Sequence, residues 1–183
     1  MTTAQNSAPK VKRVNRGKLF EQALEQQHKL YEQAGVAVLR HTDPPIREIF
    51  FKGKRVIVRL RNPFLDYAGT WRTHGGKAMF IEAKATVDYK LRVDGSQGHG
   101  VDERQMHSLR VWRAGGALAF LLWQSPAGIL LADVAALDCV FQQLGRKYVQ
   151  ADELVDIEGV RVVTGTDYLR AAEQVYYAKG SLK

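Results

Sequence analysis

Hydrophobic and polar positions along this chain follow two different periods, and each change of period marks the border of a predicted element. Helical spacing of three to four residues predicts helices at 15–35, 101–116 and 166–180. Short apolar or alternating runs predict strands at 36–40, 64–71, 76–84, 117–123, 128–137 and 159–165, of which 128–137 drifts into a helix. These elements favour one α/β or α+β domain in which helices flank a mixed β-sheet.

Two segments do not follow this simple alternation of buried elements. Residues 46–63 alternate apolar and basic positions around a Lys-Gly-Lys turn, which predicts a basic hairpin. The hairpin either contributes two strands to the sheet or projects from the body as an arm. Residues 85–100 are polar and rich in glycine, and we expect a loop there.

One predicted strand carries an acid and a base where its apolar run should continue. Because side chains alternate along a strand, Phe80, Glu82 and Lys84 share one face. Glu82 and Lys84 then lie roughly 7 Å apart along the backbone. Asp66 heads the preceding strand, and a hairpin that closes at Thr-His-Gly-Gly would let Asp66 face Glu82. Two carboxylates this close repel each other unless a cation lies between them.

Oxygen ligands of this kind indicate magnesium or manganese rather than zinc. An ion on Asp66 and Glu82, with the carbonyl of Ala83 as a further ligand, would polarise a phosphate oxygen and lower the pKa of a bound water. Lys84 would orient that water and offset the charge on the phosphate. The pattern therefore predicts phosphodiester hydrolysis. The alternative is a solvated acid–base pair on an exposed strand.

The charge distribution supports a polyanionic partner. The chain has 183 residues, 45% of them hydrophobic, and a net charge of +8. Residues 1–61 hold 13 Lys and Arg against 5 Asp and Glu, whereas residues 62–183 hold 14 of each kind. A basic field confined to one part of the chain favours nucleic acid, and the alternative is a charge that serves solubility.

Other classes of protein are disfavoured by what the chain contains. The single Cys139 excludes an internal disulfide and a cysteine metal cluster, and the five histidines lack the spacing of metal ligands. No run of about 18 apolar residues predicts a membrane span. The N-terminus has no apolar segment typical of a secretory signal. We therefore expect a cytoplasmic protein with no membrane partner.

Asp66 followed by Glu82-Ala83-Lys84 resembles the motif of the PD-(D/E)XK nuclease superfamily, although Leu65 stands where that motif has proline. A closer resemblance is to RecU-type Holliday junction resolvases and covers about residues 15 to 125. Three stretches carry it: Asn-Arg-Gly-Lys-Leu-Phe-Glu at 15–21, the segment from Leu-Asp-Tyr-Ala-Gly-Thr-Trp to Phe-Ile-Glu-Ala-Lys at 65–84, and Arg-Gln-Met-His-Ser-Leu at 104–109.

The resemblance implies a restriction-endonuclease-like domain over 15–183 that forms a homodimer. Such a dimer cleaves four-way DNA junctions symmetrically in recombination and repair, with Mg²⁺ as cofactor and Mn²⁺ as a substitute. Asp66 and Glu82 would bind the metal, and Lys84 would be the catalytic base. Glu21 would join or support the metal site, and Gln105 would support it from the following helix. The alternatives are that Glu21 is a surface residue of an amphipathic helix and that Gln105 has a structural role.

The resemblance also implies a stalk that enters the junction centre. Residues 44–63 occupy its place, although they are few for a stalk. Phosphate contacts are expected from the stalk's basic residues Arg47, Lys52, Lys54, Arg55, Arg59 and Arg61. A flexible basic arm at 1–14 and the start of the first helix would add contacts from Lys10, Lys12, Arg13 and Arg16.

Two other functions compete with junction resolution. One is a nuclease of the same fold that acts on duplex or flapped DNA. The other is a basic DNA-binding protein without catalysis, in which the acids are structural. Trp112 and Trp123 are expected to fill the core, and Trp71 to lie in the core or at an interface.

Overall fold

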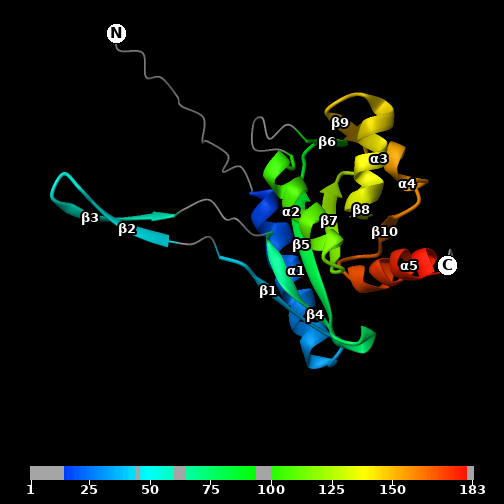
Figure 1. The fold of residues 1–183 in the computed structure, drawn as a ribbon, viewed down its shortest axis with the longest axis horizontal. Coiled ribbons are helices and arrows are strands. Elements are labelled where there is room, and N and C mark those ends of the chain that lie inside the picture. The colour runs from blue at the N-terminus through cyan, green and yellow to red at the C-terminus, as the bar shows by residue number, and fades with distance from the viewer. Residues whose placement is uncertain (1–14, 44–45, 60–64, 94–99, 181–183) are drawn as a thin grey trace, which may run out of the picture.

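The centre of the molecule is a six-stranded mixed sheet with the order β1-β4-β5-β7-β8-β10 (Figure 1). The computed structural model describes residues 15–43, 46–59, 65–93 and 100–180. Only β5 and β7 pair in parallel, and the other neighbours in this sheet are antiparallel. The strands are β1 Ala37–His41, β4 Tyr67–Trp71, β5 Lys77–Ala85, β7 Leu118–Ser125, β8 Gly128–Asp133 and β10 Val160–Val163.

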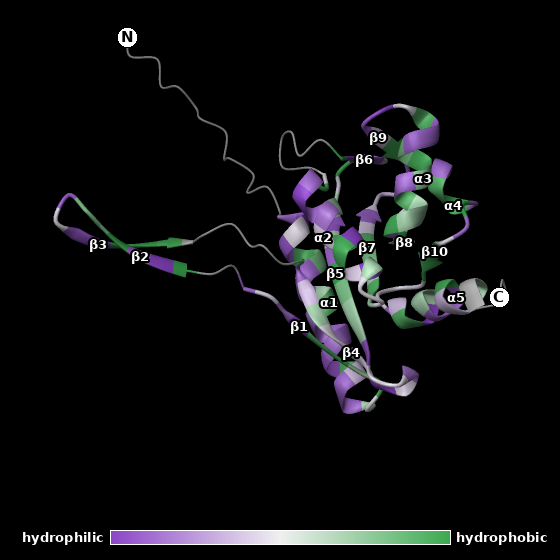
Figure 2. Ribbon diagram, viewed as in Figure 1, coloured by the Kyte–Doolittle hydropathy of each residue, from purple (hydrophilic) through white to green (hydrophobic). Residues whose placement is uncertain are grey.

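Helices cover both faces of the sheet and enclose two buried clusters. On one face, α1 (Arg16–Gln33) and α5 (Tyr168–Gly180) contribute residues such as Phe20 and Leu169. On the other face, α2 (Glu103–Ala114) and α3 (Val134–Leu144) contribute residues such as Leu109 and Leu137. Figure 2 shows the hydrophobic strands β7 and β8 between these helices. A mixed sheet flanked by helices confirms the predicted fold class.

The hairpin predicted from the basic alternating segment stands apart from this sheet. Strands β2 (Ile46–Phe51) and β3 (Lys54–Arg59) form their own two-stranded sheet, which extends away from the domain (Figure 1). Lys52 and Gly53 close it with φ values of 50° and 72°. Two consecutive positive φ angles match the right-handed twist of a tight hairpin. The chain therefore uses this segment as an arm.

Three short elements were missed by the sequence pattern. Strand β6 (Lys90–Arg92) lies within the predicted loop and pairs with β9 (Tyr148–Gln150), and α4 (Asp152–Val155) follows β9. Each of the two strands buries one apolar side chain, Leu91 or Val149, which is too little for a periodic signal. The predicted arm at 1–14, and residues 94–99 of the predicted loop, lie outside the described residues.

A candidate active site between β4, β5 and α2

The pairing of β4 with β5 places the two predicted metal-binding acids side by side. Tyr67 pairs with Ile81, so the same register extended by one residue sets Asp66 opposite Glu82. The strands are joined through η1 (Arg72–His74) and two glycines with positive φ, as the Thr-His-Gly-Gly motif predicted. The sequence therefore located this juxtaposition correctly.

Asp66 is held at the entrance of β4 by main-chain bonds. Its Oδ2 accepts a 2.9 Å hydrogen bond from the backbone N–H of Ala83. Its carbonyl accepts a 2.9 Å bond from the N–H of Thr42, whose hydroxyl donates to the carbonyl of Leu65. The part played by Thr42 was not predictable, because the contact joins residues that are distant along the chain.

Glu82 lies in the interior, and only one of its two carboxylate oxygens has a hydrogen-bond partner. The residue is 0% exposed. Its Oε1 accepts a 2.5 Å bond from Gln105 Nε2 and lies 2.5 Å from Lys84 Nζ. Its Oε2 is buried and has no hydrogen-bond partner among the described residues. A buried carboxylate oxygen without a donor is costly unless another positive group approaches it.

The electrostatics of Glu82 show the same shortage of positive charge. Burial, together with the nearby carboxylate of Asp66, raises the pKa of Glu82 to about 8, although the Lys84 ammonium acts in the opposite direction. One lysine is therefore too little to keep Glu82 ionised at neutral pH. A divalent cation beside Asp66 and Glu82 would supply the missing charge.

Lys84 occupies its predicted place as a positively charged donor. Burial lowers the pKa of Lys84, but the carboxylates of Glu82 and Asp66 outweigh burial and raise the pKa above its ordinary value. The amine is therefore an ammonium at neutral pH. The role of base, which the family resemblance implies, requires a further cation beside Lys84, because like charges lower the pKa of an ammonium.

Gln105 reaches Glu82 because the start of α2 fixes it. The Asp102 side chain caps this helix by accepting from the Gln105 N–H at 2.9 Å, and the Gln105 Oε1 accepts from the Asp102 N–H at 2.9 Å. This reciprocal arrangement is a capping box, and it leaves the Gln105 amide NH₂ free to face Glu82. The helix had been predicted to begin at 101, one residue before the cap, so the capping role of Asp102 was missed.

Glu21 lies near Asp66 without forming a three-carboxylate cluster among the described residues. Burial raises the pKa of Glu21, and the Asp66 carboxylate raises it as well. The Tyr67 hydroxyl donates to the Glu21 carbonyl at 3.3 Å, which ties α1 to β4. Across the described parts of the chain, no three His, Cys, Asp or Glu side chains are grouped closely enough to hold a metal ion. A supporting role for Glu21 stays a prediction.

The oxygen atoms that could bind a metal at this site suit a hard divalent cation. Asp66, the unpartnered oxygen of Glu82 and the carbonyl of Ala83 would bind the ion, and all three are oxygen ligands. Magnesium commonly binds through one or two carboxylates and keeps several of its waters. A site with two carboxylates from the described residues is therefore compatible with this metal.

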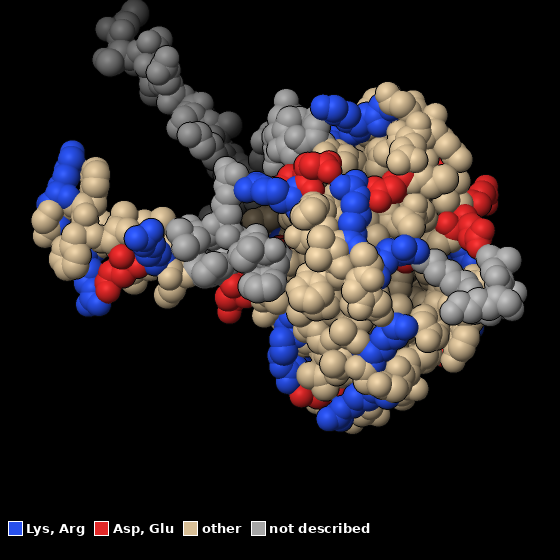
Figure 3. Space-filling view, in the orientation of Figure 1, with Lys and Arg blue, Asp and Glu red and all other residues tan. Residues whose placement is uncertain are grey.

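The basic residues predicted to contact DNA divide into two described groups. Arg47, Lys52, Lys54 and Arg55 are exposed on the β2–β3 hairpin, where Figure 3 shows Lys and Arg side chains, and Arg16 is exposed at the start of α1. Arg55 forms an ion pair with Glu48 on the neighbouring strand, so it is less available than the other hairpin cations for a contact with a DNA phosphate. Arg59 belongs to β3, and Lys10, Lys12, Arg13 and Arg61 lie outside the described residues.

Comparisons with known proteins find similarity only at the level of structure. No protein-family model and no curated protein matches the sequence. The Holliday junction resolvase Hjc of Archaeoglobus fulgidus is similar with a TM-score of 0.40 and 17% identity, over 66% of this chain and 78% of that chain. A protein named SSO0001 is similar with a TM-score of 0.30 and 15% identity, over 86% of this chain and 58% of its own. At these scores neither likeness bears on the chemistry of the site.

The resolvase among these neighbours is of the Hjc type, so the RecU-type assignment stays a prediction. Among the described residues, the helices are all too short or too polar to cross a membrane.

Proposed function

We propose that this chain is a divalent-metal-dependent DNA endonuclease that cleaves four-way junctions. The observation that carries the proposal is the buried Glu82, which has one oxygen bound by Gln105 and Lys84 and the other without a hydrogen-bond partner among the described residues, beside Asp66. A purely structural acid in a core would have both oxygens satisfied. A pair of acids that is held in place but lacks a compensating positive charge is typical of a site that binds a cation and a substrate.

The residues of the chain have distinct roles in phosphodiester hydrolysis. Asp66, Glu82 and the Ala83 carbonyl would hold the ion, which when bound supplies Lewis acidity toward water and phosphate. The Lys84 ammonium would stabilise the negative charge that builds up on the phosphate oxygens as water adds to phosphorus and the ester P–O bond breaks. Gln105 positions Glu82 for this task, because it binds the oxygen that faces away from the proposed ion.

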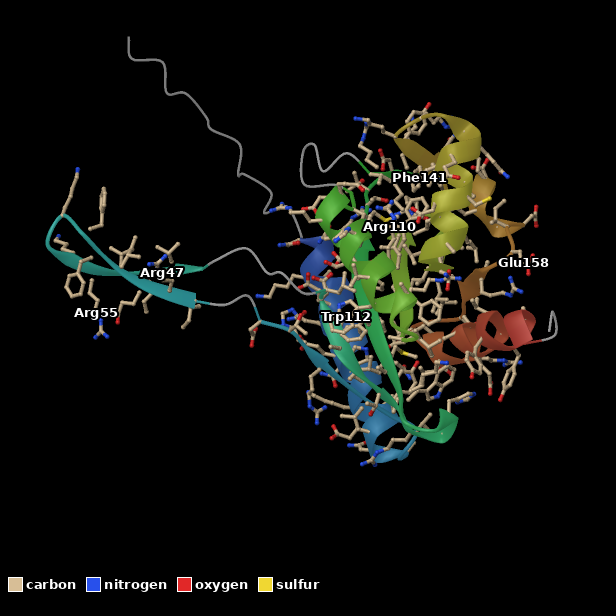
Figure 4. The ribbon with its side chains drawn as sticks, viewed as in Figure 1. Arg47, Arg55, Arg110, Trp112, Phe141 and Glu158 are labelled. Atoms are coloured by element: carbon tan, nitrogen blue, oxygen red, sulfur yellow. The ribbon has the colours of Figure 1, made fainter. Side chains whose placement is uncertain are left out.

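The projecting hairpin supports a branched DNA substrate. Arg47, Lys52 and Lys54 lie on an arm that extends from the domain, where Figure 4 shows Arg47 at its side. Exposed cations on an arm that lies outside the domain would contact phosphates beyond the strand being cut. Two such chains in a homodimer would present two active sites to the two strands of a junction.

Cleavage of a synthetic four-way junction, compared with a linear duplex of the same sequence, tests the proposal. Products are sized on a denaturing gel with Mg²⁺, with Mn²⁺ and with EDTA. We expect paired cuts near the branch point that require the metal. Cleavage of both substrates at the same rate would favour a duplex nuclease, and metal-independent binding without cuts would favour a non-catalytic DNA-binding protein.

Single variants connect this activity to the site. Asp66→Asn and Lys84→Ala should retain junction binding and lose cleavage by roughly 100-fold or more. Glu158→Gln is the matched control, because Glu158 is exposed and lies on the far side of the domain from the site (Figure 4). Normal cleavage by either site variant would show that the site is assigned wrongly.

A further inference from the structure

A row of uncharged residues that includes Phe80 lies next to the row of acids on the same face of the sheet. Side chains at alternate positions of β5 share a face, so Phe80 points to the same side as Glu82. On β4, Ala68 pairs with Phe80, just as Asp66 lies opposite Glu82. The two rows are therefore separated by one repeat of the strand, which is roughly 7 Å.

Phe80 is one half of a stacked aromatic pair. Its ring and that of Trp112, on α2, have centroids 3.9 Å apart and an interplanar angle of 14°. Both residues pack against the core from its edge and are only partly buried. Trp71 and Trp123, in contrast, are 2% and 1% exposed. The expectation that Trp112 fills the core is thus only half right, and Trp112 is the one tryptophan of the three with appreciable exposure.

The sheet beside this pair is open on the same face. Thr70 and Ala78, which pair with each other across β4 and β5, are exposed, whereas their chain neighbours Trp71 and Met79 on the opposite face are buried. Thr70 and Ala78 are both small residues, so the sheet is accessible beside the stack. Figure 4 shows Trp112 in front of the sheet, and the near face of Figure 3 has an uncharged area there with Lys and Arg at its borders.

We infer that the Phe80–Trp112 pair is a stacking platform for a nucleobase beside the scissile phosphate, which rests on the nuclease function proposed above. A nucleobase presents a flat π face whatever its identity, and the partly exposed indole of Trp112 offers a large aromatic surface on which a base can stack. One strand repeat from the acids is comparable with the reach of a nucleotide from its phosphate to its base. The platform would thus receive the base attached to the phosphate being cut.

The platform takes a base at the branch point rather than one inside a duplex. Bases within a duplex are stacked on both sides and offer no free face, so an enzyme must extrude them at a cost of a few kcal/mol. At a branch point the stacking is interrupted, and a base there exposes a face at lower cost. The pair Phe80 and Trp112 would then add to the preference for junctions and set the position of the cut. Trp112 is accordingly a positioning residue.

Tryptophan fluorescence of the full chain tests the contact directly. The emission of the wild type and of Trp112→Phe is measured as a four-way junction is added in EDTA, where no cleavage occurs. We expect the junction to quench the wild type, and the quench to be largely lost in Trp112→Phe, because Trp71 and Trp123 are buried. An equal quench in both proteins would overturn the platform.

Cleavage mapping provides the second readout. Trp112→Leu should slow junction cleavage by roughly 5- to 100-fold and scatter the cut positions, because the stacking of one base is lost. Trp112→Phe should keep the wild-type positions, since it retains an aromatic ring, and it also serves if Trp112→Leu does not fold. Val111→Ala, which removes exposed apolar surface from the same helix, is the control.

The two proposals fail in different ways. A wild type that cleaves junctions, with Trp112→Leu cutting at the same rate and positions, would overturn the platform alone. A wild type that neither binds nor cleaves DNA would overturn the nuclease function and the platform with it.

Discussion

Gln105 joins Glu82 to the start of a helix: its Nε2 donates to Glu82 Oε1 at 2.5 Å while its Oε1 accepts from the backbone of Asp102. These two hydrogen bonds fix the orientation of the Gln105 side-chain amide. This relationship explains why the buried acid presents its other oxygen toward Asp66, and it makes Gln105 a positioning residue for the proposed metal site.

Gln105→Ala should lower the affinity of the site for metal more than it lowers the free energy of unfolding. Partners that orient a metal ligand typically contribute 10- to 100-fold to metal affinity or activity. We expect the Mg²⁺ concentration for half-maximal cleavage to rise by roughly tenfold or more. Gln142→Ala, an exposed glutamine on α3, is the control. An unchanged Mg²⁺ titration would reduce Gln105 to a helix-capping residue.

Glu82→Gln should stabilise the metal-free protein and abolish cleavage. The amide would keep an acceptor for Gln105 and Lys84 and would place an NH₂ group where the unpartnered oxygen now faces Asp66. Satisfying a buried polar group of this kind is worth about 1 kcal/mol in the free energy of unfolding. Urea unfolding in EDTA above pH 8, where Glu82 is ionised, measures the change, with Glu158→Gln as control. A destabilised variant would mean that Oε2 already has a partner in solution.

Acid should destabilise the protein through His28. This residue is 3% exposed, contacts Tyr168 through a 2.7 Å Nε2–Oη hydrogen bond, and lies against the rings of Tyr31 and Tyr67. Burial, with a smaller contribution from the charge of Arg40, lowers the pKa of His28 from 6.5 to about 4. Between pH 6.5 and 4 the unfolded chain takes up a proton that the folded chain refuses, so stability is lost as the pH falls.

The loss attributable to His28 is about 3 kcal/mol when the window has been crossed. Urea unfolding from pH 7 to pH 4 measures it against His28→Gln, which cannot titrate. The wild type should lose more stability than the variant over this range. Parallel curves for the two proteins would show that His28 is not the group responsible.

Gly69→Ala should prevent β1 from packing against β4. A Cβ atom at this position would lie 1.9 Å from the Val38 carbonyl oxygen, which belongs to the backbone and cannot rotate away. We expect a loss of a few kcal/mol in stability, because the two strands must separate locally. Gly115→Ala is the control, since the nearest atom to its Cβ is at 3.4 Å. Thermal melts compare them, and equal melting temperatures would contradict the close approach of the strands.

Neutralising the hairpin should change how salt affects DNA binding. The triple variant Arg47→Gln, Lys52→Gln, Lys54→Gln removes three exposed cations from β2 and β3. If these cations neutralise phosphates, the slope of log affinity against log salt should become shallower by about 2 to 3. Lys29→Gln and Arg72→Gln, at exposed positions of the domain, provide the comparison. An unchanged slope would remove the hairpin from the DNA interface.

The acid pair and its lysine were predictable because the strand period fixes which residues share a face. Once a turn was placed at Thr-His-Gly-Gly, the register of Asp66 with Glu82 followed from counting. Strand β7 was predictable for another reason, since an almost unbroken apolar run is typical of a buried central strand. Gly69, within the Leu-Asp-Tyr-Ala-Gly-Thr-Trp stretch, also has a structural cause, since the backbone of Val38 leaves no room for a side chain there.

Features that depend on packing between distant segments did not show in the sequence. The Phe80–Trp112 stack joins a strand to a helix whose relative rotation no period reveals. The pairing of β6 with β9 rests on one buried residue in each strand. Whether Glu21 faces the acids depends on how α1 crosses the sheet, which spacing within α1 does not determine.

The β2–β3 hairpin has thermodynamic consequences for association. It exposes apolar side chains on both of its faces, among them Phe50 and Ile57 on one and Phe51 on the other. A two-stranded ribbon in water is only marginally stable by itself. Complex formation would therefore include the ordering of this ribbon, and the heat-capacity change on titrating junction DNA should exceed that of a variant in which the ribbon is replaced by a short glycine linker.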